Sequence, residues 1–299
     1  MPPELPGLLL VHAHPDDESL ATGGLIARAV AEGRRVDLVT CTGGEEGEIH
    51  DPTLDYDEAF PRLRAIREEE LRCSLDALRA EGPGQLHLHL LGYRDSGMMG
   101  TPSSDRPEAF WHVALDEAVG RAVAIIRSAR PAVIVTYDPN GNYGHPDHIN
   151  AHRVAVAAWE AAADGSRYPQ AGAPHAVAKL YEIAFNQDRW TALMTDMSAR
   201  GIPLPWDFGA EPESGQEPES FGVPEAEITT IVDVAAHAAA KRASMECHRT
   251  QRQDMGWLLD LPDDLAALAI SPEHFMLTRW RDRQVPGDGQ PEASVFDGL

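Results

Sequence analysis

The sequence predicts an α/β fold in which a mostly parallel sheet is flanked by helices. Short apolar runs of strand length alternate with longer stretches in which apolar residues recur at helical spacing. The chain has 299 residues, 43% of them hydrophobic, which is enough for one large core. Alternation of this kind is typical of right-handed βαβ units, whose helices cover both faces of a parallel sheet.

Five apolar runs are expected to form strands of this sheet. They are 8–11 (LLLV), 36–40 (VDLVT), 86–91 (LHLHLL), 132–136 (AVIVT) and 178–185 (AKLYEIAF). Bulky aliphatic residues dominate the first four runs, whereas 178–185 also contains charged and aromatic residues. Such runs are typical of strands that are buried on both faces of a sheet.

Five stretches with helical spacing lie between or after these runs. They cover 20–33, 62–82, 115–131, 149–163 and 232–251. In the second stretch, Leu71, Leu75 and Leu78 fall on one helical face. Gly33 is well placed to end the first helix, because glycine readily adopts the left-handed conformation that closes a helix.

The pattern divides the chain into three parts. Residues 1–185 are predicted to form the α/β core, and residues 186–283 a smaller, irregular portion that completes the domain and its pocket. Within the second part, 201–227 is rich in Pro, Gly and Glu, a composition that favours a linker over a flap. Residues 284–299 are predicted to be a polar, frayed tail.

The charge of the chain excludes some partners. It has 48 Asp plus Glu against 25 Lys plus Arg, a net charge of −23, which repels nucleic acids and anionic membranes. No apolar run reaches the roughly 18 residues of a membrane span. Residues 1–7 lack the basic and apolar regions of a signal peptide. We therefore expect a cytoplasmic protein without nucleic-acid or membrane partners.

The three cysteines, Cys41, Cys73 and Cys247, are odd in number and far apart along the chain. This pattern predicts no disulfide framework and suits a reducing cytosol. We expect the three side chains to act as small buried hydrophobic groups.

Polar loops directly follow four of the predicted strands. They are HAHPDDE at 12–18, CTGGEEGEIHD at 41–51, RDSG at 94–97 and PNGNYGHPDH at 139–148. Ligands of open α/β sheets bind outside the carboxyl ends of the strands. We therefore expect these loops to converge on one rim and to form a site there.

Three residues of these loops form a candidate metal site. His14 and Asp17 lie three positions apart across a turn that Pro15 stiffens, and His148 is able to supply a third ligand. Two imidazoles and a carboxylate with an open fourth position are a common zinc arrangement. One Zn²⁺ per chain is expected, and Fe²⁺ suits the same ligands. Such an ion polarises a carbonyl and lowers the pKa of water.

The neighbours of these ligands indicate acid–base chemistry. Asp16 cannot easily point the same way as Asp17, which leaves it free to act as general base. His145 and Asp147 have the pattern of a histidine that a carboxylate holds in one tautomer or keeps protonated. Such a histidine is suited to stabilise an oxyanion or to protonate a leaving amine, and Tyr143 to donate a further hydrogen bond.

Each His-Pro-Asp motif alone is equally typical of a turn followed by a helix cap. Two such motifs, each close behind an apolar strand, favour a shared site instead. We expect His248, in MECHRTQ, to line this site, and His12 to lie behind the ligands. His152 is expected to pack or to support the ligands rather than to bind metal.

With these motifs, the chain resembles the zinc-dependent N-deacetylases of the LmbE-like (PIG-L) family. The matching motifs are HAHPDDE at 12–18, TCTGGEEGE at 40–48, RDSGM at 94–98 and YDPNGNYGHPDH at 137–148. The resemblance, weaker elsewhere, extends to about residue 280 and implies a Rossmann-like sheet. The motifs are most similar to the mycothiol branch, which contains N-acetylglucosaminyl-inositol deacetylase and mycothiol S-conjugate amidase.

The resemblance implies a role for each matching residue. His14, Asp17 and His148 match the metal ligands, and Asp16 matches the general base. Tyr143 and His145 match the oxyanion and leaving-group partners, and Asp147 the residue that orients His145.

Three further residues match the substrate side of the family's site. Arg67 matches an arginine that holds the sugar or inositol, and Asp95 a carboxylate near the sugar hydroxyls. Glu48 lies in the matching acidic loop.

The expected activity is removal of the acetyl group from an N-acetylglucosaminyl conjugate of the inositol type, as in mycothiol biosynthesis. The amidase branch has a lysine shortly after the first motif where this chain reads SLAT at 19–22, which favours the deacetylase. Cleavage of an S-conjugate, or deacetylation of another small N-acetylglucosaminide, remains the alternative. A two-metal phosphoesterase and a glycan-binding module without catalysis are less favoured. The expected partner is the small-molecule substrate, and a homo-oligomer stays open.

Overall fold

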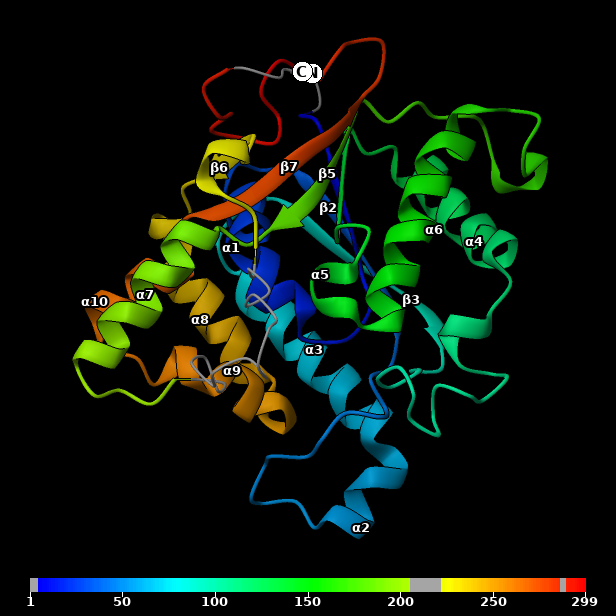
Figure 1. Cartoon of the computed structure of the whole chain (residues 1–299). Helices are drawn as coiled ribbons and strands as arrows, with labels where there is room; N and C mark the ends of the chain where they lie inside the picture. Colours follow the sequence, from blue (N-terminus) through cyan, green and yellow to red (C-terminus); the bar gives the residue numbers. More distant parts are fainter. Residues whose placement is uncertain (1–4, 205–221, 286–288) are drawn as a thin grey trace, which may run out of the picture.

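The computed structural model describes residues 5–204, 222–285 and 289–299 (Figure 1). These residues contain a seven-stranded sheet with strand order β3-β2-β1-β4-β5-β7-β6. The strands are β1 (Leu8–His12), β2 (Arg35–Thr42), β3 (Gln85–Tyr93), β4 (Val133–Thr136), β5 (Lys179–Ala184), β6 (Thr230–Val232) and β7 (Glu273–Trp280). Strands β1 to β5 pair in parallel, whereas β7 runs antiparallel to β5 and β6. The predicted α/β fold with a mostly parallel sheet is confirmed.

The five predicted strands correspond to β1 to β5. The chain leaves β1 toward β2 and β3 on one side and later returns to β4 and β5 on the other. The point where the order reverses therefore lies between β1 and β4, which pair with each other at Leu8 and Val133. In open α/β sheets, ligands bind at the carboxyl ends of the strands beside such a point.

The helices of the described residues are α1 (Asp17–Ala31), α2 (Tyr56–Ala59), α3 (Leu63–Arg79), α4 (Leu115–Ala129), α5 (Gly141–Gly144), α6 (Pro146–Ala163), α7 (Gln187–Ala199), α8 (Ala238–Cys247), α9 (Arg252–Leu259) and α10 (Asp263–Ile270). Helices α1, α3 and α8 pack together, and α4 packs on α6 (Figure 1). Because βαβ crossovers are right-handed, the reversal of strand order places these two groups on opposite faces of the sheet.

The C-terminal part is less well predicted. The stretch 232–251 does not form one long helix, because Val232 ends β6 and α8 begins only at Ala238. Strand β7 and helices α7, α9 and α10 were not expected; the last three bury a second apolar cluster that includes Leu193, Met255 and Leu265. Strands β6 and β7 belong to the same sheet as β1. The division of the chain at residue 185 stays a prediction. Of the expected linker, residues 205–221 lie outside the described residues.

The prediction of no disulfide is wrong. Cys73 on α3 and Cys247 at the end of α8 form a disulfide with a Cα–Cα distance of 5.7 Å, although 174 positions separate them in the sequence. Cys41 is free and buried, as expected. Sequence spacing conceals the pair because only the packing of α3 against α8 brings the two residues together.

The predicted frayed tail is also a wrong expectation. Val295 and Phe296 are buried in the main core, and Lys179 Nζ donates a hydrogen bond of 2.6 Å to Glu292 Oε1. Most of the residues that flank Val295 and Phe296 along the chain are polar. Composition alone therefore suggests a solvated end.

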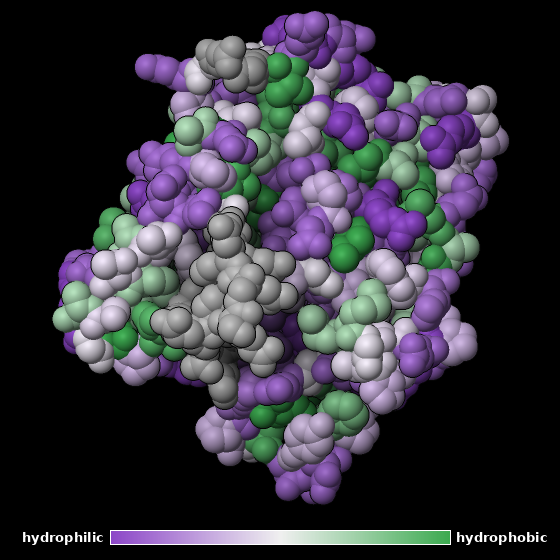
Figure 2. Space-filling model, in the orientation of Figure 1, coloured by the Kyte–Doolittle hydropathy of each residue, from purple (hydrophilic) through white to green (hydrophobic). Residues whose placement is uncertain are grey.

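The surface agrees with the composition. Hydrophilic residues cover most of the face shown in Figure 2, and hydrophobic residues lie there in small separate groups. Within the described ranges, no helix combines the length and the apolar character needed to cross a lipid bilayer.

Candidate active site

The four polar loops meet at the carboxyl edge of the sheet, where they surround a cavity of about 820 Å³. Its lining includes His14, Asp16, Asp17, Glu46, Glu48, Arg67, Asp95, Gly97, Tyr143 and His145. His148, Asp147 and His248 are buried behind this lining. The strand ends thus bring together side chains from distant parts of the sequence.

His14, Asp17 and His148 form a compact triangle. His148 Nε2 lies 3.2 Å from His14 Nδ1, and each nitrogen lies 3.5 Å from an oxygen of Asp17. Donor atoms at 2.0–2.1 Å from a tetrahedral ion stand roughly 3.3 Å apart. The spacing and the chemistry of these three groups therefore fit a metal ion with one face open toward the cavity.

His14 also belongs to two further sets of close donor atoms. His14, His145 and His148 have ligand atoms within 4.8 Å of one another, and so do His14, Asp95 and Asp147. The sets differ because the two nitrogens of His14 face different groups: Nδ1 faces His148, whereas Nε2 lies 3.3 Å from Asp147 and 3.6 Å from Asp95. A carboxylate on the far nitrogen of a ligating histidine fixes its tautomer and orientation. This arrangement leaves Nδ1 free for an ion.

The predicted pairing of Asp147 with His145 is wrong. The Asp147 carboxylate accepts hydrogen bonds from the Ser96 hydroxyl and, over 3.0 Å, from the Ser96 N–H, and it faces His14. Only the backbone N–H of Asp147 reaches His145, where it donates to Nδ1 over 3.1 Å. Asp147 is in the first turn of α6, and the partners of its carboxylate are Ser96 and His14.

The surroundings of His145 favour the neutral form of its ring. Burial, with His14 and His148 nearby, lowers the pKa of His145 to about 3. Because Nδ1 accepts the Asp147 N–H, the single proton of the neutral ring is carried by Nε2. His145 lines the cavity, so this proton is available to a ligand there.

Tyr143 lies on the open side of the same group. Its side chain is 55% exposed, and its ring centroid is 4.9 Å from that of His148 and 6.1 Å from that of His145. The turn that presents it includes Asn142 at φ 65°, a conformation that asparagine tolerates better than most residues.

Asp16 is held in an unusual backbone conformation, with φ 118° and ψ −32°. A non-glycine residue there costs about 1–3 kcal/mol and persists only where its surroundings enforce it. Burial raises the pKa of Asp16 to about 7, although the Arg67 guanidinium, 3.1 Å away, lowers it. A carboxylate of this pKa is well matched to proton transfer near neutral pH.

Arg67 mainly braces the loops that form the site. Its Nη1 donates to the Gly44 carbonyl over 2.8 Å and its Nη2 to the Pro15 carbonyl over 2.6 Å. A Cβ at Gly44 would lie 2.4 Å from this guanidinium, so the close approach requires glycine. Arg67 also lines the cavity, but most of its hydrogen-bonding capacity is used within the protein.

Asp95 and Glu48 occupy different depths of the cavity. Asp95 is 3% exposed and accepts the N–H groups of Gly97 over 2.8 Å and of Glu46 over 3.1 Å. The Glu48 side chain is 81% exposed and lies 3.1 Å from His50 at the rim. Of these two carboxylates, only Asp95 is thus fixed in place before a ligand binds.

His248 does not line the cavity, contrary to expectation. It is 1% exposed, and its Nε2 lies 2.8 Å from Glu18 Oε1, behind the first loop. His12 and His152 are at supporting positions, as expected, because each hydrogen-bonds to Tyr137: His12 to its hydroxyl over 3.3 Å and His152 to its carbonyl over 2.8 Å.

Sequence analysis missed three supporting residues, Tyr137, Ser96 and Glu18. The Tyr137 hydroxyl donates to Asp17 Oδ2 over 2.7 Å and accepts the Ala13 N–H over 2.8 Å, which fixes the first loop against β4. Tyr137 directly follows β4, so the rule that found the other residues at strand ends could have found it too.

Comparison with known proteins extends these observations. Residues 9–159, which carry all four loops, match the family PIG-L, described as GlcNAc-PI de-N-acetylase. The chain is 43% identical over 304 residues to a Geodermatophilus obscurus protein, covering 98% of this chain and 97% of that one. It is 46% identical over 301 residues to a Catenulispora acidiphila protein, at 98% and 89% coverage. Both relatives are named as 1D-myo-inositol 2-acetamido-2-deoxy-α-D-glucopyranoside deacetylases.

Solved structures share the fold at low sequence identity. The N,N'-diacetylchitobiose deacetylase of Pyrococcus horikoshii has a TM-score of 0.58 at 17% identity, covering 91% of this chain and 83% of that one. A 4-carboxy-2-hydroxymuconate hydratase of Pseudomonas putida has the same TM-score, 0.58, at 14% identity, covering 95% and 100%. Since the two neighbours carry out different reactions, the fold alone does not decide the activity.

Proposed function

Because this chain belongs to the PIG-L family of de-N-acetylases, we propose that it hydrolyses the acetamide of 1D-myo-inositol 2-acetamido-2-deoxy-α-D-glucopyranoside. The chain is an enzyme, an N-deacetylase that acts on an amide. The products are acetate and the free amino sugar. Such an enzyme serves mycothiol biosynthesis, as the sequence resemblance implies.

One observation supports this proposal above the others. The donor triangle of His14, Asp17 and His148 lies next to Asp16, and the cavity beside it is lined by both acidic groups and hydrogen-bond donors. A cavity of about 820 Å³ is within the usual size range for a small-molecule site. These are the parts that metal-assisted amide hydrolysis needs, within the reach of one ligand.

We assign the metal to His14, Asp17 and His148, as one Zn²⁺ per chain, with Fe²⁺ as the alternative for the same ligands. A metal ion bound there supplies Lewis-acid polarisation of the amide carbonyl and water of lowered pKa. The carboxylates of Asp147 and Asp95 keep the ring of His14 turned so that Nδ1 points toward Asp17 and His148, the other two residues that would hold the ion.

The chain's own residues carry the proton transfers. Asp16 accepts the proton of the attacking water as the oxygen–carbon bond forms. His145 Nε2 and the Tyr143 hydroxyl donate hydrogen bonds to the oxygen that becomes negative. The carbon–nitrogen bond then breaks, and Asp16 returns its proton to the departing amine. Asp95, Arg67 and Glu48 also line the cavity, and we propose that they contact the sugar and the inositol.

We further propose a cytoplasmic location and, on the basis of the charge of the chain, no nucleic-acid or membrane partner. The Cys73–Cys247 disulfide has a bearing on this location, because cytosolic reductants compete with disulfides. Counting free thiols in freshly lysed cells would establish which form is present. A homo-oligomer stays open.

An amine-release assay tests the function. The purified chain is given the inositol conjugate, other small N-acetylglucosaminides and a mycothiol S-conjugate, and metal content is measured on the same sample. We expect release of glucosaminyl-inositol to be fastest, with one metal per chain. Faster cleavage of the S-conjugate would identify an amidase, and a metal-loaded, folded chain that releases no amine would refute the proposal.

A further inference from the structure

The backbone of Asp16 differs from every other positive-φ non-glycine residue among the described residues. The others have φ between 48° and 65°, whereas Asp16 is at 118°. Conformations of this kind persist only when neighbouring groups hold them in place. The groups that hold Asp16 therefore determine where its carboxylate points.

Glu18 is one of the groups that hold Asp16. Its Oε2 accepts the Asp16 N–H over 2.9 Å, and its side chain is fully buried. An uncompensated carboxylate would be costly at such a position. Its other oxygen has two partners: the Ser74 hydroxyl at 2.6 Å and His248 Nε2 at 2.8 Å.

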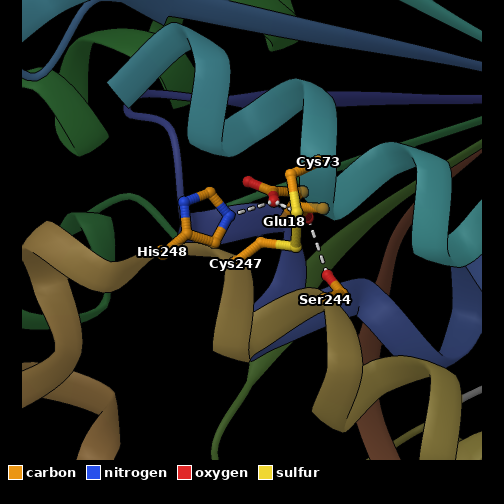
Figure 3. Close-up of a disulfide and its surroundings, with 6 residues drawn as sticks. Glu18, Cys73, Ser244, Cys247 and His248 are labelled. Carbon is orange, nitrogen blue, oxygen red and sulfur yellow. Dashed lines mark hydrogen bonds and ion pairs between the residues drawn. A yellow bond between two sulfur atoms is a disulfide. The ribbon is translucent and has the colours of Figure 1, made fainter. Parts of the chain in front are cut away.

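These two partners come from different helices that pack against each other. Ser74 is on α3, and His248 directly follows α8. The Ser74 hydroxyl also lies 2.7 Å from that of Ser244 on α8. Figure 3 shows Glu18 between His248 and Ser244. The position of Glu18 thus depends on how α3 and α8 are aligned.

The disulfide fixes that alignment. Cys73 adjoins Ser74, and Cys247 adjoins His248, so the S–S bond links the neighbours of the two residues that hold Glu18 (Figure 3). Cys73 is exposed and lines a separate surface pocket of about 500 Å³ together with Cys247, outside the active-site cavity. The disulfide is therefore reachable from solvent, whereas Ser74 and His248, which it aligns, are buried.

We propose that Glu18 and His248 are positioning residues that hold the backbone of Asp16, and that the Cys73–Cys247 disulfide clamps this support in place. The proposal rests on the proposed function in that Asp16 is the base. It gives His248 a role other than substrate contact, and it connects a solvent-exposed disulfide with the turnover rate.

Glu18→Gln tests the first part. An amide has a single acceptor atom, so it cannot accept both the Asp16 N–H and the donors on α3 and α8. We expect kcat to fall roughly 10–100-fold, as for other supporting groups of metal sites, with KM and metal content near those of the wild type. The fall in kcat at constant KM separates positioning from general destabilisation.

Glu70→Gln is the matched control. Like Glu18, Glu70 is a buried carboxylate, but it is on α3. It accepts the Thr250 N–H over 2.9 Å and the Thr250 hydroxyl over 2.6 Å, and it does not contact Asp16. This variant should lose stability but keep a kcat close to that of the wild type. Equal losses of kcat in Glu18→Gln and Glu70→Gln would overturn the positioning role.

Two variants of His248 give a second comparison. His248→Gln retains a donor near the position of Nε2, whereas His248→Leu leaves Glu18 without it. We expect His248→Gln to keep more activity than His248→Leu. If the two variants are equally impaired, hydrogen bonding to Glu18 is not what His248 contributes.

The clamp is tested with the double variant Cys73→Ser/Cys247→Ser. It should remain folded by circular dichroism and bind metal, yet show a lower kcat with an unchanged KM. Wild-type kcat in this variant would remove the disulfide from the proposal. If the wild type releases no amine from any substrate, the proposed function fails instead.

Crystal structures of the wild type and of Glu18→Gln then decide the positioning role, since φ of Asp16 should relax in the variant.

Discussion

The Asp147 carboxylate lies 3.3 Å from Nε2 of His14, a residue 133 positions earlier in the chain. It therefore supports the imidazole whose other nitrogen faces Asp17 and His148, and not that of His145, two residues before it. The local motif and the tertiary contact thus assign different partners to the same carboxylate. The chemistry of the site follows the tertiary contact.

Asp147→Asn should weaken metal binding. An amide retains the shape of the side chain but loses the charge that orients His14, and changes of this kind typically cost 10–100-fold in metal affinity or activity. Metal affinity measured by competition with a chelator checks the effect. Asp164→Asn, which alters an exposed carboxylate after α6, is the control and should leave the affinity unchanged. Tight metal binding by Asp147→Asn would mean that the His14 contact is dispensable.

Asp16→Asn and His14→Ala should fail in different ways. Asp16→Asn keeps the three ligands but removes the base, so kcat should fall by about 10²–10⁴-fold while metal remains bound. His14→Ala removes one corner of the triangle, and the purified variant should contain little metal. Metal analysis and amine release on the same samples distinguish the two. Near-normal turnover by Asp16→Asn would exclude Asp16 as the base.

Loss of the Cys73–Cys247 disulfide should lower the stability of the chain. The bond closes a long loop, since 174 positions separate the two cysteines, and native disulfides typically contribute about 2–4 kcal/mol. Urea unfolding of Cys73→Ser/Cys247→Ser should show a free energy of unfolding lower by that amount. The wild type in excess dithiothreitol is the control and should unfold like the variant. Equal stability with and without the bond would contradict this expectation.

Glu182 on β5 should make stability depend on pH. Burial and the charge of Asp138 together raise its pKa to about 7. The folded chain therefore holds this proton more tightly than the unfolded chain, so the stabilising contribution is full below the unfolded pKa of about 4.3 and is lost as the pH rises toward 7. Glu182→Gln stays neutral and should lose less stability between pH 5 and pH 8.

Urea unfolding of the wild type and Glu182→Gln at both pH values measures the difference. Glu160→Gln, which changes an exposed glutamate on α6, should follow the wild type. Parallel pH profiles for all three chains would show that Glu182 is not the responsible group.

Local patterns were sufficient to predict the five parallel strands β1 to β5 and the edge of the sheet where the polar loops meet. Runs such as 8–11 and 132–136 are apolar over the length of a strand, and each is closely followed by the polar residues that line the cavity or support it. A buried strand can be predicted from its own residues alone, and the carboxyl ends of parallel strands lie at one edge of the sheet. This is why the sequence alone predicts that His14, Asp17 and His148 lie together.

The C-terminal part could not be predicted in the same way. Strand β6 has three residues, and helices α9 and α10 have eight each, too short for a clear periodicity. Their structure depends on the partners they pair or pack with, such as β7 for β6. Short elements of this kind are specified by tertiary contacts more than by their own sequence.

The sequence by itself determined the α/β class, the rim of polar loops and the set of groups with metal-binding chemistry, because each depends on residue type and spacing within one segment. Only the tertiary structure decided that Asp147 supports His14, that His248 is buried against Glu18 and that Cys73 joins Cys247. The physical reason is that side-chain hydrogen bonds have a direction in space, which the sequence does not give. A side chain's partner depends on where its bonds point after helices and strands have packed, and neighbours in space can be far apart along the chain.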